Sequence, residues 1–557
     1  MGKKYVFGID LGTTYTSVCY VDESGRTVVI PNLEGSDITP SVVQILDNGD
    51  AVVGDVAKEN AVIEPDSTIS LVKRLMGNTA VARTINGHDY SPQEISALIL
   101  KKIAADVKAS SLGAEMTDVV ITCPAYFGDK ERIATQDAGR IAGLNVMELL
   151  KEPLAAAIHF GCTGTGENKT YMVFDLGGGT FDVTIMRIDG NRIKEVCSDG
   201  DHQLGGADWD KRLIGYLKDR FTEQATGSVE WTPEDMQTLT MAAEKAKKAL
   251  SAKPETAVRV EAGGESQRIT VTREIFDEIT EAERSSAFDI TDRAIASAKA
   301  KGVTVDEILM VGGSTLMPQI KEAIIAKYGI EPKSHEPTLA VSKGAALYAV
   351  KVYQERQEAV KAMNNWTGDP AEAPAPVENP DDYAEPLSVD PLLIASGKAP
   401  EIITATTKSY GVAVVDPRNP SHECISNLIM KNTSMVDPAT GKPADSVTKH
   451  GPFGTAEANQ MAVSIRIYES DNESPMYDID EDFLLGNADL KLDGNLPIGA
   501  PLEITLTLDR AGLLHVHGKD MTGGHEIDAD LHIKGVMSTA DVDALAEKTK
   551  STQIKGI

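Results

Sequence analysis

Apolar residues follow two patterns over the first 363 residues. Short runs rich in β-branched residues, each ending in Gly, Asp or Pro, occupy residues 5–10, 118–124, 170–177 and 307–313. Residues 92–110 and 215–224 instead carry apolar side chains at the three- and four-residue spacing of a helix. Strands that alternate with helices favour an α/β domain, which we place at residues 1–363.

The pattern changes after residue 363. Residues 364–403 are rich in Pro, Ala and acidic residues, which is typical of a mobile linker or an insertion. Residues 404–536 alternate apolar and polar positions in runs such as YGVAVVD, MAVSIRIYE and LEITLTLD, and turn signals separate these runs. They predict an antiparallel β-sandwich. In residues 537–557, Ser538 is a candidate N-cap for a helix.

Composition narrows the function classes. A chain of 557 residues exceeds one ordinary core, so at least two domains are expected. The net charge of −30 argues against a nucleic-acid partner, because two polyanions repel each other. The five cysteines stand singly, which indicates reduced thiols and not a zinc site. The start is too short for a signal peptide, and no uncharged apolar stretch approaches the ~20 residues of a membrane span. A cytoplasmic protein without a membrane segment is therefore expected.

One motif occurs twice in the α/β region. Residues 9–14, IDLGTT, return as residues 174–180, FDLGGGT, each time after an apolar strand. A duplicated motif predicts two similar lobes that face each other across a cleft. Glycines free backbone N–H groups to form a nest for phosphate oxygens, so two nests could clamp a triphosphate.

The polar side chains of these segments suit the same ligand. Hydroxyl groups on Thr13, Thr14 and Thr180 can donate to phosphate oxygens. The carboxylates of Asp10 and Asp175 are oxygen ligands of the kind that Mg²⁺ prefers. The doubled motif therefore predicts a site for a nucleotide triphosphate with Mg²⁺.

A third glycine pair follows another apolar strand. Gly312 and Gly313 stand late in the α/β region, where they would let a flat base or ribose approach the backbone. Because Gly-Gly is common in turns, the late position of this pair is what supports the assignment.

These segments, in this order, resemble the 70-kilodalton heat-shock (Hsp70) chaperone family, in its bacterial type. The resemblance covers nearly the whole chain and implies an actin-like (duplicated ribonuclease H-like), two-lobed α/β nucleotide-binding domain followed by an antiparallel β-sandwich. Actin and sugar kinases share the phosphate hairpins but lack the PAYF-D-ER segment and the β-sandwich. The residues that carry the resemblance are IDLGTTYTSV, ITCPAYFGDKERIATQDAGRIAGL, KEPLAAA, VFDLGGGTFDVT, LGGADWDKRL, VGGST, LIMKNTS, FGTAEANQMAVSIRIYE and GLLHVHGKDMTGG.

The resemblance assigns roles around ATP or ADP and Mg²⁺, and it leaves K⁺ open as a further cation. Lys73 would be the catalytic lysine near the γ-phosphate, where a cation offsets developing negative charge. The other catalytic residues would be Glu152, Asp175 and Thr180. The metal would be held through Asp10, Asp175, Glu152 and Asp182. The nucleotide would contact Gly12, Thr13, Thr14, Tyr15, Gly177, Gly178, Gly179, Gly205, Gly206, Glu244, Lys247, Lys248, Ser251, Gly312, Gly313 and Ser314.

The resemblance also implies a peptide channel in the β-sandwich, where an extended peptide would gain backbone hydrogen bonds and fill a side-chain pocket. Pro124 and Arg132 would transmit the nucleotide state to the sandwich. The expected partners are unfolded polypeptide segments, a J-domain co-chaperone and a nucleotide exchange factor. The channel residues would be Val412, Val415, Phe453, Ala456, Val463 and Ile465.

Four positions depart from the family pattern. Leu316 stands where the family usually has an arginine against adenine, and Lys248 replaces the opposing arginine. The loss of planar guanidinium stacking should weaken base binding. Thr338 replaces an aspartate near the ribose. Glu148 stands where many bacterial members have a basic residue that meets the J-domain.

Two further features differ from the family. Either residues 392–394 (Leu-Leu-Ile) or residues 402–403 (Ile-Ile) could be the interdomain linker. The helical lid is expected to be truncated, because only its first helix, near residues 538–550, has a counterpart. An isolated helix of that length is marginal in water, so we expect it to fray or to dock weakly.

The resulting hypothesis is an ATP-dependent chaperone. ATP binding would close the lobes, dock the linker and the sandwich, and loosen the grip on peptide, and hydrolysis would reverse these changes. One alternative is a non-enzymatic ATP-binding regulator, against which intact Lys73, Glu152 and Thr180 argue. The other is a small-molecule kinase, against which the β-sandwich argues.

Overall fold

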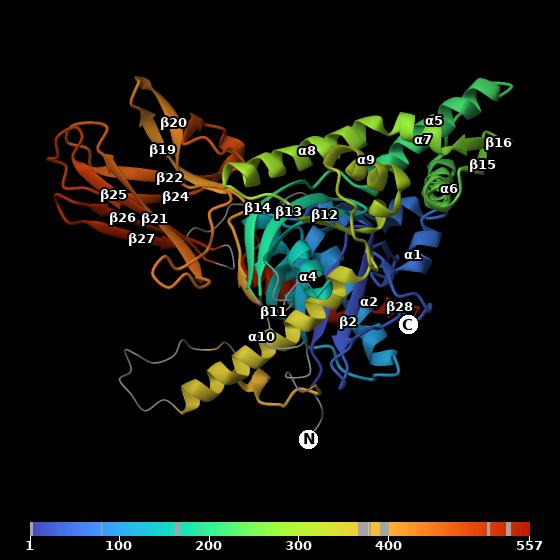
Figure 1. The fold of residues 1–557 in the computed structure, drawn as a ribbon, viewed down its shortest axis with the longest axis horizontal. Coiled ribbons are helices and arrows are strands. Elements are labelled where there is room, and N and C mark those ends of the chain that lie inside the picture. The colour runs from blue at the N-terminus through green and yellow to red at the C-terminus, as the bar shows by residue number, and fades with distance from the viewer. Residues whose placement is uncertain are drawn as a thin grey trace.

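A two-lobed α/β part forms the larger body of the molecule, and a β-sandwich projects from one side of it (Figure 1). The computed structural model describes residues 4–78, 81–161, 168–190, 192–365, 377, 380–389, 400–509, 513–530 and 536–556. The helices are α1 (Asp55–Asn60), α2 (Pro92–Ala109), α3 (Asp129–Ile141), α4 (Glu152–His159), α5 (Gly206–Gln224), α6 (Pro233–Ala252), α7 (Arg273–Ile279), α8 (Glu281–Ala300), α9 (Pro318–Tyr328), α10 (Ala340–Asn364) and α11 (Thr539–Ser551).

Lobe I is built on a mixed sheet in the order β11-β10-β1-β2-β3, with β4 paired to β2. β1, β10 and β11 are parallel, whereas β1, β2 and β3 are antiparallel. Phe7 and Ile9 pack with α2 and α3, and Val6 and Val120 pack with α4 and α10, so helices cover both faces of the sheet. The strands are β1 (Phe7–Leu11), β2 (Tyr15–Val21), β3 (Thr27–Val29), β4 (Thr39–Pro40), β10 (Asp118–Cys123) and β11 (Asn145–Lys151).

Lobe II repeats this plan with a sheet in the order β17-β12-β13-β14-β18. One face, with Met172 and Phe174, packs against α5 and α8. The opposite face, with Tyr171 and Val173, packs against α4 and α10. The strands are β12 (Asn168–Leu176), β13 (Phe181–Asp189), β14 (Arg192–Asp201), β17 (Glu307–Val311) and β18 (Glu401–Ile403).

Helices α4 and α10 therefore form a layer shared by the two lobes. Their residues belong to one hydrophobic cluster with apolar side chains from both sheets. Glycines permit the close approach of this layer: a Cβ atom on Gly344 of α10 would lie 1.7 Å from the carbonyl oxygen of Ala155 on α4. A Cβ atom on Gly8 of β1 would likewise lie 2.0 Å from the backbone nitrogen of Ala346.

Smaller sheets complete the two lobes. In lobe I, β5, β6 and β7 form a sheet with β28, and β8 pairs with β9. In lobe II, β15 and β16 form a hairpin beside α6. The strands are β5 (Val43–Ile45), β6 (Ala51–Val53), β7 (Thr68–Ile69), β8 (Arg83–Ile85), β9 (His88–Tyr90), β15 (Glu255–Ala262), β16 (Glu265–Thr272) and β28 (Ile554–Lys555).

The period-2 region forms two antiparallel sheets, in the orders β23-β20-β19-β22-β24 and β21-β25-β26-β27. One cluster that includes Tyr410, Ile467 and Leu506 fills the space between them. The alternating pattern thus predicted these strands correctly. They are β19 (Ser409–Asp416), β20 (Asn419–Ile429), β21 (Ser446–Gly454), β22 (Ala462–Ser470), β23 (Met476–Asp478), β24 (Leu484–Lys491), β25 (Pro501–Asp509), β26 (Leu514–Asp520) and β27 (Glu526–Asp530).

One of the two linker candidates is part of the lobe II sheet. Ile402 and Ile403 belong to β18, which pairs in parallel with β14, and both side chains are buried. Residues 392–394 lie outside the described residues. Residues 401–403 form an edge strand of lobe II and lead directly into the sandwich.

The expectation that the last helix frays or docks weakly is wrong. Helix α11 packs on α2 and α3, where Val542 is 2% exposed and contacts Ala97 and Ile141. Lys548 pairs with Glu94, and β28 extends the smaller sheet of β5, β6 and β7 in lobe I by pairing with β6. A tertiary apolar contact and added strand pairing stabilise a helix that would be marginal alone.

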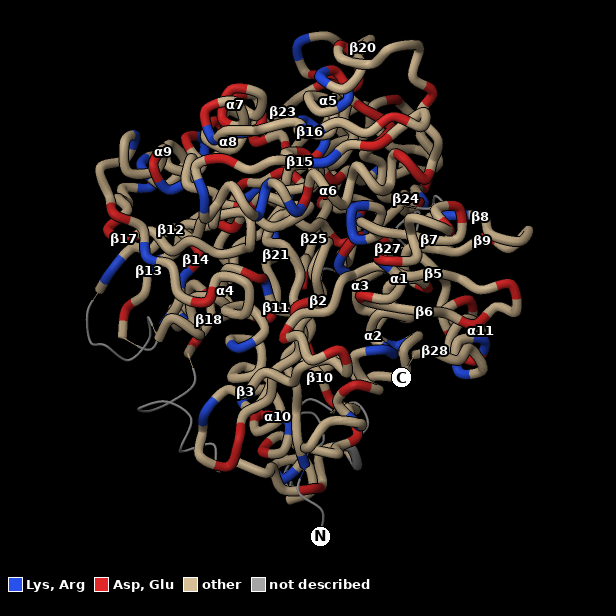
Figure 2. The backbone as a smooth tube through the Cα atoms, turned by 90° about the vertical axis from the view of Figure 1, so that its right-hand side faces the viewer, with Lys and Arg blue, Asp and Glu red and all other residues tan. Residues whose placement is uncertain are grey.

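The structure shows where the charged residues and the cysteines lie in the described part of the chain. Acidic and basic residues are spread over both lobes and the sandwich (Figure 2). Cys19, Cys123, Cys197 and Cys424 are buried and free, as predicted. Within the described part of the chain, every helix is too short or too polar to span a bilayer.

Candidate nucleotide-binding cleft and interdomain contact

A cavity of about 630 Å³ opens between the two lobes. Both copies of the repeated motif line it, together with the third glycine pair and one face of α6. The sequence-predicted residues that line it are Asp10, Gly12, Thr13, Thr14, Tyr15, Lys73, Glu152, Asp175, Gly177, Gly178, Thr180, Glu244, Lys247, Lys248, Ser251, Gly312, Gly313 and Ser314. Gly179, Gly205, Gly206 and Asp182 do not line the cavity.

The two glycine hairpins meet face to face. A Cβ atom on Gly178 would lie 2.1 Å from Oγ1 of Thr14, and one on Gly179 would lie 2.2 Å from Cγ2 of Thr13. Gly205 packs behind them, because its Cβ atom would lie 2.5 Å from the backbone nitrogen of Gly179. The glycines thus let backbone from both lobes approach a shared centre, which is the arrangement that phosphate binding requires.

A buried cluster of carboxylates surrounds one lysine. Lys73 donates to Oε1 of Glu152 at 2.6 Å, and both side chains are buried. Burial and the charge of Glu152 raise the pKa of Asp10 to about 7, that of Asp182 to about 8 and that of Asp175 well above its ordinary value. The single positive charge of Lys73 does not balance the negative charge of these carboxylates when they are ionised. All the donor atoms of the carboxylates are oxygens, which fits Mg²⁺.

Charged side chains bridge the cleft near its rim. Tyr15 donates to Glu244 at 2.9 Å, and Lys58 of α1 donates to the other oxygen of Glu244 at 2.5 Å. Lys248 donates to the Tyr15 hydroxyl at 2.8 Å. Burial works against ionisation, but Lys58 and Lys248 lower the pKa of Glu244 to about 2. Lys58 was not predicted from the sequence, where it is the single lysine of a short polar helix.

The third glycine pair is fixed from both sides. The N–H of Gly312 donates to the carbonyl of Pro337 at 2.9 Å, and the Ser314 hydroxyl donates to the carbonyl of Gly177 at 2.8 Å. Lys247 donates to the carbonyl of Gly206 at 2.8 Å.

Leu316 follows the glycine pair at residues 312–313, lines the cavity and is 54% exposed. An apolar side chain therefore stands where the resemblance leads us to expect a guanidinium group.

Replacing Leu316 by Arg should tighten ATP binding by a few- to about thirty-fold. A guanidinium stacked on a base contributes about 0.5–2 kcal/mol. Calorimetric titration of the wild type and of Leu316→Arg measures the change. Leu316→Lys is the matched control, because it adds the charge without the planar group and should gain less. Equal affinities in all three proteins would show that the base does not contact this position.

The edge strand β18 leads into an ion pair that joins the two lobes. Lys151 of β11 and Glu195 of β14 pair at 3.0 Å, and both are almost fully buried. Lys151 donates to the carbonyl of Ala405 at 2.9 Å, and Glu195 accepts from the N–H of Ala405 at 2.9 Å. Ala405, two residues after β18, thus contacts lobe I and lobe II together.

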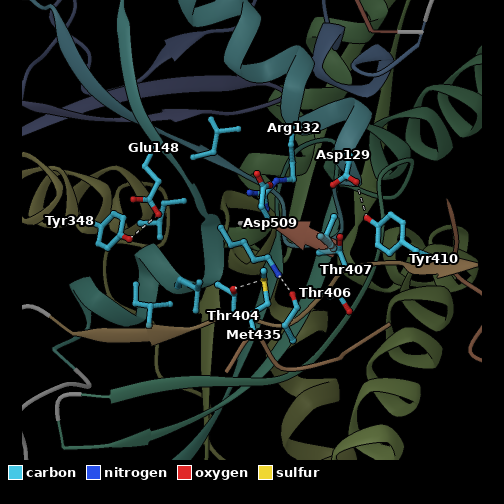
Figure 3. Close-up of a pocket in the computed structure, with 17 residues that line it drawn as sticks. Asp129, Arg132, Glu148, Tyr348, Thr404, Thr406, Thr407, Tyr410, Met435 and Asp509 are labelled. Atoms are coloured by element: carbon cyan, nitrogen blue, oxygen red, sulfur yellow. Dashed lines mark hydrogen bonds between the residues drawn. The ribbon is translucent and has the colours of Figure 1, made fainter. Parts of the chain in front are cut away.

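Lobe I also contacts the sandwich directly, around a small cavity of about 60 Å³ (Figure 3). Tyr410 of β19 donates to Asp129 of α3 at 3.0 Å, and Arg132 of α3 lines the same cavity. Pro124 lies just before this helix, and its carbonyl accepts from the N–H of Phe127 at 3.2 Å. The N–H of Tyr126 donates to Asp182 of the carboxylate cluster at 3.0 Å, so the segment that follows β10 connects this cluster to the sandwich.

The predicted channel residues lie on both sheets of the sandwich. Val412 and Ile465 are buried in its core, and Phe453 and Val463 are partly buried against that core. Val415 is 38% exposed, and Ala456 is exposed in the loop after β21.

A nucleotide cleft connected by one edge strand to a separate β-sandwich is the arrangement expected of an ATP-driven chaperone. The model of the family described as Hsp70 protein matches residues 6–363. Chaperone protein DnaK of Thermotoga neapolitana is 34% identical over 557 residues, which cover 98% of this chain and 84% of the relative. Chaperone protein DnaK of Thermosipho africanus is 32% identical over 556 residues, with 98% and 83% covered. The chain therefore belongs to the Hsp70 family, and it is an ATPase and an ATP-dependent chaperone of unfolded proteins.

Proposed function

We propose that this chaperone couples its nucleotide state to peptide binding through the docked linker strand. The observation that carries the proposal is the position of Ala405, whose backbone contacts Lys151 of lobe I and Glu195 of lobe II. Rotation of one lobe against the other would separate the two halves of this buried ion pair, and the linker would lose its site. Nucleotide closure and linker docking would then stabilise each other reciprocally.

In this proposal the cleft residues have the roles that the family resemblance implies. The backbone of the hairpins and the hydroxyls of Thr13, Thr14 and Thr180 hold the phosphates. Lys73 offsets the charge that develops on the γ-phosphate. Mg²⁺ held by the carboxylates would neutralise phosphate charge. Whether a further cation such as K⁺ takes part is tested by replacing K⁺ with Na⁺ in the ATPase assay. The adenosine lies against α6 and the glycine pair at residues 312–313.

The chain divides into four parts in this proposal. We assign residues 1–363 to the nucleotide-binding domain, 364–403 to the linker or insertion, 404–536 to the peptide-binding sandwich and 537–557 to the start of a lid. An actin-like topology of the first domain is supported by the repeated sheet plan of the two lobes. The proposed location is the cytoplasm, with a J-domain co-chaperone and a nucleotide exchange factor as partners.

The decisive measurement is ATP turnover with and without an unfolded, hydrophobic peptide. A peptide that stabilises the undocked state should raise the steady-state rate several-fold, because the two sites are coupled. A rate that is measurable but independent of peptide would contradict the coupling. Phosphorylation of a small molecule in place of water would instead support a kinase on the same fold.

Glu148 should weaken the response to a general J-domain protein. Its carboxylate accepts from the Tyr348 hydroxyl at 3.0 Å and lines the interdomain cavity beside the linker (Figure 3). A negative charge there repels the loop aspartate that J-domains present, and like charges in an interface cost several kcal/mol. We expect Glu148→Arg to lower the J-domain concentration needed for half-maximal stimulation by at least about tenfold.

The matched control is Glu148→Gln, which removes the repulsion without adding an attraction and should lie between the other two proteins. Strong stimulation of the wild type, with no gain in Glu148→Arg, would contradict the role of this residue.

A further inference from the structure

Two of the places where the chain passes between the lobes lie close together, and three side chains with metal-binding chemistry meet there. It leaves lobe I after α4, whose last residue is His159, and enters lobe II at β12. It returns to lobe I between α9 and α10, through a segment that contains His335 and Glu336. Residues separated by more than 170 positions in the sequence are thus brought to the same point of the interlobe hinge.

The ligand atoms of these residues are close enough to share one ion. Nε2 of His159 lies 3.7 Å and Nε2 of His335 lies 3.6 Å from Oε2 of Glu336. Bonds of about 2.0–2.1 Å in a tetrahedral site place ligand atoms about 3.3–3.4 Å apart, so small side-chain rotations would suffice. Among the described residues, these three form the only group of His, Cys, Asp or Glu whose ligand atoms all lie within 4.8 Å.

The local structure already orients the ligands. The rings of His159 and His335 are stacked, with centroids 6.0 Å apart and planes 11° from parallel. Glu336 has φ 44°, a left-handed conformation that is uncommon for a glutamate. Lys343 of α10 donates to Oε2 of Glu336, the same oxygen that faces the two histidines, at 2.6 Å. Hydrogen bonds of this kind commonly hold ligating carboxylates in place.

One atom of the group lacks a partner that its position requires. Nε2 of His159 is buried and forms no hydrogen bond within the described part of the chain. A buried polar atom without a partner destabilises the fold, and the ionisable side chains around this one are Lys343, Glu336 and His335. A cation between the three side chains would supply the missing partner.

We propose that His159, His335 and Glu336 form a binding site for a divalent transition metal of the Zn²⁺ type. Two imidazoles and one carboxylate favour such metals over Mg²⁺ and Ca²⁺, which prefer oxygen ligands alone. Three protein ligands leave one coordination position for water. The bound ion would join the two chain crossings between the lobes. Pro337, the next residue, accepts from the N–H of Gly312 in the cleft, so the site is adjacent to nucleotide-contacting backbone.

Calorimetric titration of the nucleotide-free, metal-stripped chain with Zn²⁺ tests the proposal. Millimolar Mg²⁺ should be present so that the oxygen-only cluster of the cleft is occupied. We expect one equivalent of Zn²⁺ to bind to the wild type with an affinity that falls by at least roughly tenfold in His335→Ala and in Glu336→Gln. His335 is suited to this test because its side chain is 70% exposed, so its loss should not disturb the fold.

The matched control is His525→Ala. This exposed histidine pairs with Asp493 on the sandwich and should contribute nothing to the Zn²⁺ site. Zn²⁺ should also raise the melting temperature of the wild type and of His525→Ala, and not that of His335→Ala. Equal Zn²⁺ affinity and stoichiometry in the wild type and in His335→Ala would overturn the proposal.

Discussion

Replacement of Lys73 by Ala should lower the rate of ATP hydrolysis by at least about 100-fold while ATP affinity changes by less than about threefold. The ammonium group is expected to stabilise charge that develops only in the transition state, and loss of one such group typically costs two to three orders of magnitude. Single-turnover hydrolysis measures the chemical step, and equilibrium titration measures the binding of ATP.

The matched control is Lys102→Met on α2. Lys102 is as buried as Lys73 and pairs with Asp106 at 2.6 Å, but it does not line the cleft. It should lower stability without slowing the chemical step of the folded protein. Hydrolysis by Lys73→Ala at the wild-type rate would refute the catalytic assignment.

Replacement of Ile403 by Asp should abolish the coupling between ATP and peptide. Ile403 is 2% exposed in β18, and burying an unpaired carboxylate there costs several kcal/mol. The docked population should fall by more than about 100-fold, because each 1.4 kcal/mol is a factor of ten. We expect ATP to stop accelerating peptide release and peptide to stop stimulating hydrolysis, while the variant still binds ATP.

Glu401→Gln on the same strand is the control. Glu401 is only partly buried and pairs with Arg192, which is 43% exposed, so this change should leave coupling near the wild-type level. ATP-triggered release is measured with a fluorescent peptide under rapid mixing. If Ile403→Asp retained full release, β18 would not be the coupling element.

Local sequence patterns predicted the elements that local chemistry determines. The glycine hairpins could be predicted because their turns and phosphate nests depend on adjacent residues. Helix α2 is predicted at residues 92–110 and spans Pro92–Ala109, because its apolar spacing lies within the segment itself. The alternation of apolar and polar positions in residues 404–536 likewise predicts the strands of the sandwich.

Contacts between distant segments could not be predicted in this way. Lys58 and Glu244 are 186 residues apart, and only the closed cleft makes them partners. The choice of Ile402–Ile403 as an edge strand depends on a free edge of β14, which no property of the linker reveals. Helix α11 was misjudged for the same reason: its stability comes from Ala97 and Ile141 on another part of the chain.

The helix layer shared by the lobes also bears on how the molecule melts. Neither sheet has a complete core without α4 and α10, since one cluster takes apolar side chains from both sheets. A state with one lobe unfolded would expose one side of that layer to water and would lose its burial free energy. Intermediates with a single folded lobe are therefore disfavoured, and the α/β part should lose its structure as one cooperative unit.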